Sequence, residues 1–167
     1  MNRNVEIKAR LSRFTEVEQK AKVLAQSDPV VCRQRDVYFF VPNGRLKLRI
    51  TDGQRGELIY YERALAREAR ESRYLRLPVE DIEQAERLLT MALGKRGEVV
   101  KQRQLHLIGQ TRVHLDRVDQ LGEFVELEVV LRPDQSLLEG KNIAEALMGQ
   151  LGISNADLVE TSYIDLL

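Results

Sequence analysis

The stretch Gly44-Arg45-Leu46-Lys47-Leu48-Arg49-Ile50 decides how this chain is expected to fold. Basic and aliphatic residues alternate through it, and a period of two places every second side chain on the same face of a β-strand. The strand therefore has one basic face and one aliphatic face. Asn43-Gly44 precedes it, and this dipeptide suits the tight turns that join antiparallel strands. We expect a hairpin with a partner strand over 35–41.

Three other segments alternate charged and apolar residues in the same way. They are Asn4-Val5-Glu6-Ile7-Lys8-Ala9-Arg10, Arg112-Val113-His114-Leu115-Asp116 and Phe124-Val125-Glu126-Leu127-Glu128-Val129. The sign of charge is segregated among the strands, because the 45–49 row is basic whereas Glu126 and Glu128 are both acidic. A single charged row is most often a solvated face, which usually pairs opposite charges across strands. The segregated rows instead favour a sheet rolled into a barrel with a charged interior.

The rest of the chain adds further strands and three helical segments. Strand patterns cover 57–63, 72–77, 98–107, 111–118 and 123–131. A helix is expected to begin near Thr15, where Thr15 and Glu18 form a capping-box pattern. Helical periodicity recurs over 78–94 and from 137 to a stop at Gly152. Many short strands with a few helices predict an α+β domain with a largely antiparallel sheet.

Length and composition limit the classes of protein. A chain of 167 residues with 43% hydrophobic content is long enough for one domain, expected over residues 1–167. The 26 basic and 26 acidic residues cancel, so we expect neither nucleic acid nor a membrane as a partner held by bulk charge. Cys32 is the lone cysteine, which excludes an internal disulfide and favours a reducing, cytoplasmic location. The N-terminus shows no apolar signal region, and no stretch approaches membrane-spanning length.

A charged barrel interior has a specific physical consequence. Cations that converge on one channel repel each other unless carboxylates balance them or a polyanion lies between them. A triphosphate fits this requirement, because arginine offers forked donors to phosphate oxygens and lysine offers a compact charge. The basic residues expected to contribute are Arg45, Lys47, Arg49, Lys101, Arg103 and Arg112.

Carboxylates beside phosphate require a hard cation between them. Glu126 and Glu128 lie two residues apart on one strand, so they can share Mg²⁺ or Mn²⁺. Glu6 or Asp116 can add a ligand from another strand. The predicted chemistry is metal-assisted phosphoryl transfer, achieved mostly by positioning and charge neutralisation. His114 lies on the same face as Asp116 and suits a contact with phosphate, proton transfer or a structural hydrogen bond.

These residues resemble a known family. The run Asn4-Val5-Glu6-Ile7-Lys8 resembles the ExExK pattern of the CYTH superfamily, the triphosphate tunnel metalloenzymes, which include class IV adenylate cyclases and thiamine triphosphatases. The similarity continues in the family's order through Asp36-Val37-Tyr38-Phe39, Gly44-Arg45-Leu46-Lys47-Leu48-Arg49, Lys101-Gln102-Arg103, His114-Leu115-Asp116, Leu121-Gly122-Glu123-Phe124-Val125-Glu126-Leu127-Glu128 and Ser162-Tyr163-Ile164-Asp165. It covers nearly the whole chain, and its most specific parts are the 44–49 run and the paired glutamates.

The resemblance implies a closed or nearly closed eight-stranded antiparallel β-barrel, open as a tunnel and flanked by helices. It also implies a small-molecule triphosphate substrate and Mg²⁺ or Mn²⁺ as cofactor. The metal ligands carried over from the family pattern are Glu6, Glu126, Glu128 and Asn4. The phosphate ligands are Lys8, Arg45, Lys47, Arg49, Lys101, Arg103 and Arg112. The residues expected to act in catalysis are Lys8, Asp116 and Arg63.

Two positions depart from the family pattern. Asn4 stands where the first glutamate of ExExK is expected, so the site lacks one negative charge, although an amide oxygen can still bind Mg²⁺. This difference predicts weaker metal binding, the loss of a second ion, or triphosphate binding without turnover. Arg63 stands where many members have a lysine, and we expect it to take the role of that lysine.

Several reactions remain as alternatives. Hydrolysis of a nucleoside, thiamine or inorganic triphosphate is favoured, and formation of cyclic AMP from ATP by a class IV adenylate cyclase is the close alternative. Asn4 motivates a third, a sensor that binds a triphosphate without turning it over. A barrel that binds single-stranded RNA is not favoured, because the 45–49 strand has only leucine between its charges and offers no aromatic platform. A homodimer is compatible with a barrel of this size.

Overall fold

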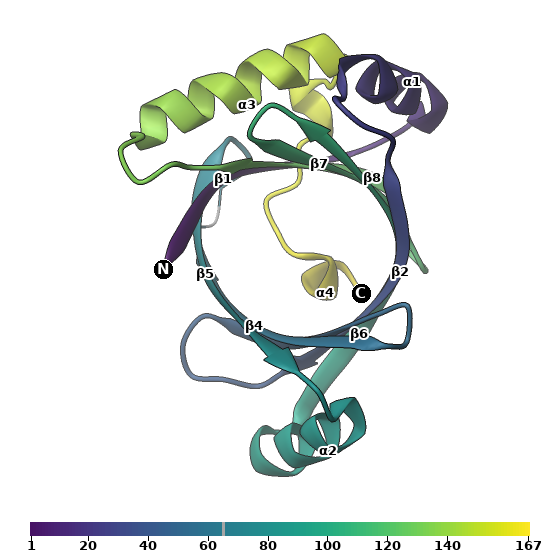
Figure 1. Ribbon diagram of the computed structural model, residues 1–167, viewed down its shortest axis with the longest axis vertical. Helices are drawn as coiled ribbons and strands as arrows, with labels where there is room; N and C mark the ends of the chain where they lie inside the picture. Colours follow the sequence, from purple (N-terminus) through teal and green to yellow (C-terminus); the bar gives the residue numbers. More distant parts are fainter. Residues whose placement is uncertain (65) are drawn as a thin grey trace.

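The protein folds as a closed β-barrel (Figure 1). The computed structural model describes residues 1–64 and 66–167. Its strands are β1 (Asn2–Arg10), β2 (Val30–Phe39), β3 (Arg45–Thr51), β4 (Arg55–Arg63), β5 (Arg70–Val79), β6 (Lys95–Ile108), β7 (Thr111–Val118) and β8 (Gly122–Val130). Around the ring they follow the order β1-β5-β4-β3-β2-β6-β7-β8, and β8 returns to pair with β1. The expected closed, eight-stranded antiparallel barrel is therefore confirmed.

Helices cover the barrel on two sides and at one end. They are α1 (Phe14–Leu24), α2 (Ile82–Leu93), α3 (Leu137–Leu151) and α4 (Tyr163–Leu166), with a 3₁₀ turn at Asn155–Asp157. In Figure 1, α1 and α3 lie on one side of the ring, α2 lies on the other, and the C-terminal α4 lies within the circle of strands. No helix in the described part of the chain is both long and apolar enough to cross a membrane.

Most of the hydrophobic core lies outside the barrel wall, and a smaller cluster that includes Val99, Phe124 and Tyr163 lies inside it, beside α4. The aliphatic rows of β1, β7 and β8 are buried beneath α1 and α3, and those of β2 and β3 are buried beneath α2. Burial of one such side chain contributes about 1.5–3 kcal/mol, so these faces hold the wall to its helices. Because side chains alternate along a strand, the ionic rows point the other way, into the enclosed space.

Near the N-terminus, the predicted start of a helix close to Thr15 is confirmed, but the predicted cap of that helix and the predicted start of the next strand were wrong. Helix α1 begins at Phe14, so Thr15 lies inside the helix and does not cap it; the N-cap is Arg13, whose side chain makes no capping bond. Phe14 is buried in the core, and this tertiary anchor outweighs the local capping signal. Strand β2 begins at Val30, before the expected residue 35, because it pairs with β6 from Val30 opposite Leu105 onward.

The helix predicted over 78–94 also begins later. Pro78 belongs to β5, and α2 begins at Ile82 after Asp81, whose carboxylate accepts a hydrogen bond from Gln84 N at 3.0 Å. A proline is tolerated there because the pairing of β5 with β1 ends at Tyr74. Pro78 lacks an N–H, but it has no β1 residue opposite it to which that N–H would donate. The expected stop of α3 at Gly152 is confirmed, with a left-handed φ of 72°.

Candidate functional site

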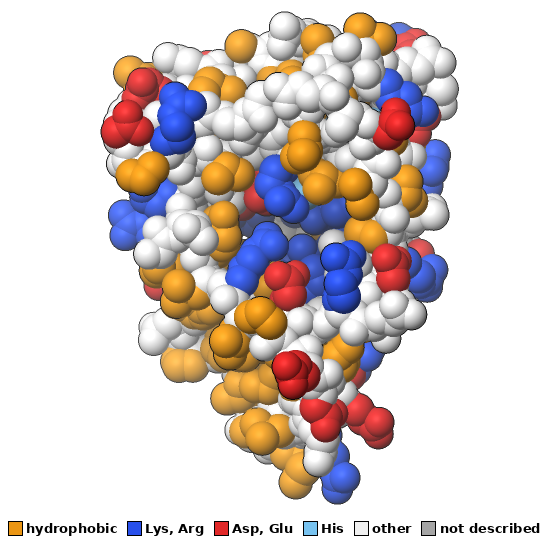
Figure 2. Space-filling view, viewed as in Figure 1, with side chains coloured by type: hydrophobic (Ala, Val, Ile, Leu, Met, Phe, Trp, Pro, Cys, Tyr) orange, Lys and Arg blue, Asp and Glu red, His pale blue; other side chains and the backbone are white. Residues whose placement is uncertain are grey.

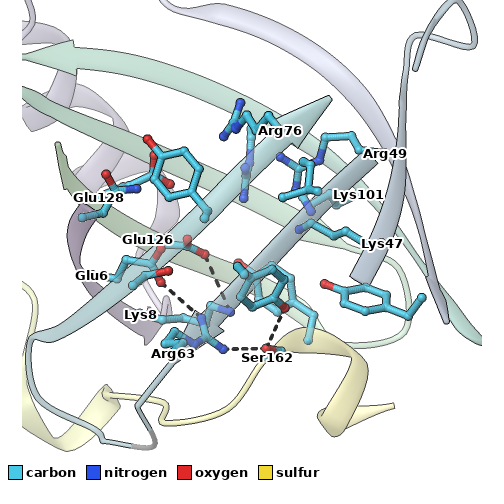
Figure 3. A pocket seen from close by; sticks show the side chains of 18 residues that line it. Glu6, Lys8, Lys47, Arg49, Arg63, Arg76, Lys101, Glu126, Glu128 and Ser162 are labelled. Atoms are coloured by element: carbon cyan, nitrogen blue, oxygen red, sulfur yellow. Dashed lines mark hydrogen bonds and ion pairs between the residues drawn. The ribbon is translucent and has the colours of Figure 1, made fainter. Parts of the chain in front are cut away.

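The ionic rows meet in a narrow cavity at the centre of the barrel (Figure 3). The volume of this cavity is about 70 Å³. Its charged and amide side chains are Asn4, Glu6, Lys8, Lys47, Arg49, Arg63, Arg76, Lys101, Arg103, Glu126 and Glu128. In Figure 3, Lys47, Arg49 and Lys101 lie on one side and the glutamates on the other. The interior therefore has a cationic side and an acidic side.

The acidic side brings three carboxylates together. Glu6 of β1 lies opposite Glu128 of β8, and oxygens of Glu6, Glu126 and Glu128 all lie within 4.8 Å of one another. Burial, together with the charges of Glu126 and Glu128, raises the pKa of Glu6 to about 7. A cluster of this kind could bind a metal ion, because a cation would offset the repulsion among the carboxylates.

Asn4 extends the same row on β1. It is 1% exposed and lines the same cavity as Glu6. Its side-chain oxygen Oδ1 is buried, and within residues 1–64 and 66–167 it has no hydrogen-bond partner. A buried oxygen without a donor costs about 1–3 kcal/mol, which a cation ligated by that oxygen would recover. The residues at this position therefore fit an oxygen-preferring metal ion.

The cationic side is organised by Asp36, a residue to which the sequence analysis assigned no role. Asp36 accepts hydrogen bonds from Arg49 Nε and Nη2, both at 2.8 Å, from Lys47 Nζ at 3.0 Å and from Lys101 Nζ at 3.1 Å. Burial alone would raise the pKa of Asp36, but the charges of Arg49, Lys101 and Lys47 hold it well below its ordinary value. Three cations share one carboxylate, so this side keeps a net positive charge.

A second buried carboxylate, Asp116, orients Arg103. The guanidinium donates from Nε and Nη2 to the two oxygens of Asp116 at 2.7 Å each, and Tyr163 donates its hydroxyl to Oδ2 at 2.8 Å. Burial opposes ionisation, but Arg103 lowers the pKa of Asp116 to about 2. Both oxygens of Asp116 thus accept hydrogen bonds from Arg103. Among the described residues, the cluster of carboxylates that could bind a metal consists of Glu6, Glu126 and Glu128 and does not include Asp116.

Lys8 and Arg63 lie between the acidic cluster and the C-terminal segment. Lys8 Nζ is 3.7 Å from Glu126 Oε2 and 3.9 Å from the centre of the Tyr163 ring. Arg63 donates from Nη1 to Glu6 Oε2 at 3.4 Å and from Nη2 to Ser162 Oγ at 2.5 Å, as Figure 3 shows. Burial lowers the pKa of Lys8 to about 8. The structure thus brings Arg63 to the acidic cluster.

Two of the predicted phosphate ligands lie outside the central cavity. Arg45 is paired with Asp165 at 2.7 Å, near the C-terminal helix. Arg112 lies toward the other end of the barrel, where its Nε is 3.6 Å from Glu128 Oε1. Sequence reasoning missed Arg76, which lines the cavity from β5. Its position two residues after Tyr74 on an alternating strand was the available signal.

The two ends of the barrel differ. Ser162 and Tyr163 of the C-terminal segment line the central cavity at one end. The other end opens into a second cavity of about 590 Å³, and four residues, Arg49, Arg76, Arg103 and Glu128, line both cavities. Figure 2 shows basic side chains gathered around a hollow at the centre of the face, with acidic and hydrophobic side chains about it.

Comparisons with known proteins agree with this architecture. PH1012 from Pyrococcus horikoshii is similar over 100% of this chain and 99% of its own, with 27% identity and a TM-score of 0.87. A candidate adenylate cyclase from Vibrio parahaemolyticus is 19% identical, with 98% and 96% of the two chains covered and a TM-score of 0.77. HpAC1 from Hippeastrum, a candidate adenylyl cyclase described as having a dominant triphosphatase activity, is 12% identical, with coverage of 99% and 94% and a TM-score of 0.70.

No match was found among curated proteins. The model of the CYTH domain family matches residues 2–163, which is nearly the whole chain and includes every strand of the barrel. The chain therefore belongs to the CYTH domain family.

Proposed function

We propose that this protein is a metal-dependent enzyme that hydrolyses a triphosphate-bearing small molecule. The observation that carries this proposal is the division of one enclosed interior into a cluster of three carboxylates and an adjoining group of buried cations. A metal ion and a polyanion complement these two sides. The total charge of the chain is balanced, so this local separation supports a specific ligand and not general attraction of anions.

Glu6, Glu126 and Glu128 would hold Mg²⁺ or Mn²⁺, with the side-chain oxygen of Asn4 as a neutral further ligand. These are hard oxygen donors, which both ions prefer. When bound, the ion would neutralise charge on phosphate and favour deprotonation of an attacking water.

The cationic side would bind the phosphate chain. Asp36 holds Lys47, Arg49 and Lys101 in place before a substrate arrives, so little reorganisation is needed on binding. Asp116 does the same for Arg103 and is a positioning residue in this proposal. Forked guanidinium donors suit phosphate oxygens. Lys47, Arg49, Lys101 and Arg103 outnumber the two aspartates, so this side keeps an excess of positive charge.

Lys8 and Arg63 would act on the phosphoryl group nearest the acidic cluster. Both contact carboxylates of the acidic cluster, so a phosphoryl group bound between the cationic and acidic sides would come within their reach. Their charges would stabilise the negative charge that develops on transfer. The triphosphatase activity described for HpAC1 supports hydrolysis, although the resemblance to that protein is one of fold.

Two alternatives follow from particular observations. The candidate adenylate cyclase from Vibrio parahaemolyticus shares this fold, which keeps the cyclisation of ATP as a second reaction. Asn4 supports a sensor that binds a triphosphate without turnover, because a neutral amide attracts a cation less strongly than a carboxylate.

A product assay separates these functions. The purified protein is incubated with Mg²⁺ or Mn²⁺ and with ATP, thiamine triphosphate or inorganic triphosphate, and phosphate and cyclic AMP are measured. Hydrolysis predicts metal-dependent phosphate release that Glu126→Gln abolishes and that Glu123→Gln, on the outer face of the same strand, leaves unchanged. Cyclic AMP with pyrophosphate would identify a cyclase. Binding with no product, and turnover restored by Asn4→Glu, would identify a sensor and contradict the proposal.

A further inference from the structure

The helices cover the two flanks of the barrel unequally. On one flank, α1 and α3 together bury the outer aliphatic rows of β1, β7 and β8. On the other flank, α2 packs against β2 and β3 through Ile82, Ala85 and Leu89, and no residue of α2 is fully buried. The outward-facing Leu75 and Leu77 of β5 remain more than half exposed. This second flank therefore keeps an apolar surface open to solvent.

The exposed leucines of β5 continue into an apolar strip on β4. In the register of the sheet, Leu58 lies opposite Leu77 and Tyr60 lies opposite Leu75. Ile59, between the two β4 residues, lines the central cavity, so its neighbours Leu58 and Tyr60 point outward. The outer face of β4 and β5 is thus apolar across both strands.

One side of α2 borders this strip. Glu86 is ion-paired with Arg35 of β2 at 2.7 Å, so the side of the helix that carries Glu86 faces β2. Leu88 lies about 200° farther around the helix and therefore faces the β4 side, because β3 separates β2 from β4. Met91 lies on the same side as Leu88, three residues later. In Figure 2, hydrophobic side chains gather along one side of the lower part of the molecule, where Figure 1 places α2, and charged side chains lie along the other side.

The size of this surface can be compared with known interfaces. Six large apolar side chains on it, which we call the apolar flank, are between 37% and 78% exposed: Phe40, Leu75, Leu77, Leu88, Met91 and Leu93. Phe40 belongs to it because its N–H donates to the O atom of Gly94, at the end of α2. At about 150–200 Å² for one fully exposed side chain of this size, the flank presents roughly 600 Å² per copy. That area is at the upper end for a monomer, where the largest apolar patch measures about 300–600 Å². Two such faces in contact would bury about 1,200 Å², which reaches the size of a specific interface.

The charges around the flank favour a second copy of the chain over a membrane surface. Helices that lie on membranes carry lysine and arginine on their polar side. Helix α2 instead carries Glu83 and Glu86 with Arg87, and Glu80 and Asp81 precede it. The 26 basic and 26 acidic residues of the chain cancel, so no net charge opposes the association of two copies.

The shape of the flank also suits self-association. A helix edge stands beside a flat, exposed strip of sheet, and both are apolar. In a two-fold dimer each surface patch meets its counterpart reciprocally. A two-fold axis that runs along the boundary between α2 and β4 would place the helix of each copy on the strip of the other.

We propose that the apolar flank is a homodimer interface in which α2 of each copy packs against β4 and β5 of its partner. Leu88 then lies against the partner's Leu77, and Leu77 lies against the partner's Leu88. The inference is independent of the proposed function, because these side chains point away from the barrel interior.

The first test measures the oligomeric state of the purified full chain by sedimentation velocity across a range of concentrations. The wild type should sediment as a dimer. Leu88→Glu and Leu77→Lys should each raise the dissociation constant of the dimer by at least about a hundredfold, because two-fold symmetry buries each new charge twice. Both side chains are exposed in one copy, at 65% and 62%, so each variant should keep its fold, which circular dichroism checks. Val23→Glu, at an exposed apolar position on α1, is the matched control and should stay dimeric.

A mixing experiment tests the reciprocal arrangement. In a mixed dimer, Glu from the Leu88→Glu chain faces Lys from the Leu77→Lys chain, and the second contact keeps its two wild-type leucines. Mixing the two monomeric variants should therefore restore a dimer that contains one copy of each.

Three results would overturn the inference. The first is a wild type that stays monomeric, whether or not it then binds vesicles of phosphatidylglycerol or a different protein. The second is a dimer that Leu88→Glu and Leu77→Lys leave intact, because its interface would lie elsewhere. The third is a mixture of the two variants that stays monomeric, because α2 of one copy would then not meet β5 of the other.

Discussion

The two sides of the barrel interior are built on opposite principles. On the cationic side, Asp36 bonds Lys47, Arg49 and Lys101 at 2.8–3.1 Å, so the protein supplies its own counter-charge. On the acidic side, three carboxylates lie within 4.8 Å and the pKa of Glu6 is raised to about 7 by burial and by its neighbours. The cationic side is thus held together by one internal carboxylate. On the acidic side, the contacts of Arg63 with Glu6 at 3.4 Å and of Lys8 with Glu126 at 3.7 Å leave the pKa of Glu6 raised, so a bound cation would stabilise this side further. Substitutions on the two sides should therefore have opposite consequences for the unliganded protein.

The largest expected effect follows from removing Asp36. Asp36→Asn leaves three buried cations with no carboxylate between them, and loss of one partner of a buried ion pair costs about 3–5 kcal/mol. The free energy of unfolding, measured with urea in the absence of ligand, should fall by that amount. Inorganic triphosphate should restore part of it, because the polyanion binds only the folded state. Asp119→Asn, in an exposed turn, is the control. An unchanged urea midpoint for Asp36→Asn would show that Asp36 does not balance the three cations.

On the acidic side, Glu6→Gln should act in the opposite direction. The folded-state pKa of Glu6, about 7, lies above its ordinary value of 4.5, so the stability it contributes at low pH is lost as pH rises through about 7. At pH 8 the neutral substitute should therefore raise the free energy of unfolding without metal, by about 1 kcal/mol. Affinity for Mn²⁺ should fall about 100-fold in calorimetry. A less stable variant at pH 8 would show that Glu6 is balanced in the same manner as Asp36.

A smaller effect is expected from pH on the cationic side. Burial lowers the pKa of Lys101 to about 8, so this lysine loses its charge as pH rises through about 8 in the unliganded protein. Triphosphate affinity should then fall, by at most about tenfold per pH unit. Stability should change in the other sense, rising between about pH 8 and the ordinary value of 10.5, since the folded state binds fewer protons.

Lys101→Arg provides the check on that assignment, because arginine stays protonated throughout this range. Titration with triphosphate from pH 7 to pH 9.5 should show a shallower decline in the variant. Part of the decline should persist, because burial lowers the pKa of Lys8 to about 8 as well. Identical profiles for the variant and the wild type would exclude Lys101 as the titrating group.

The smallest effect is expected from a substitution at Asn4 that adds a negative charge to the acidic side. Asn4→Glu places a fourth carboxylate in the acidic cluster, so Mn²⁺ affinity should rise by about tenfold while stability without metal falls slightly. Asn2→Glu, at the exposed start of the same strand, serves as the control. An unchanged Mn²⁺ affinity would indicate that the amide oxygen of Asn4 is not a ligand.

Much of the wall of the barrel could be predicted from local pattern. Alternation in the 45–49 and 124–129 segments assigns each residue to one of two faces, and that assignment needs no knowledge of the neighbouring strands. The segregation of charge then indicated that the ionic faces enclose a space, and the closed ring confirms this. The cap of α1 could not be predicted in the same way, because Phe14, which is buried in the core, begins the helix and leaves Thr15 inside it.

Local alternation is enough to identify the ionic face of each strand, since that property depends on the two-residue repeat of an extended chain. Which charges meet depends on how the strands are arranged in the folded barrel. Asp36 and Lys101 are 65 residues apart, and Lys8 and Thr161 are 153 apart, yet each pair is in contact. The second cavity, of about 590 Å³, likewise arises because β5 and β6 face each other across the ring. Register and closure are set by packing of the whole wall against its helices, so no local pattern could reveal these partners.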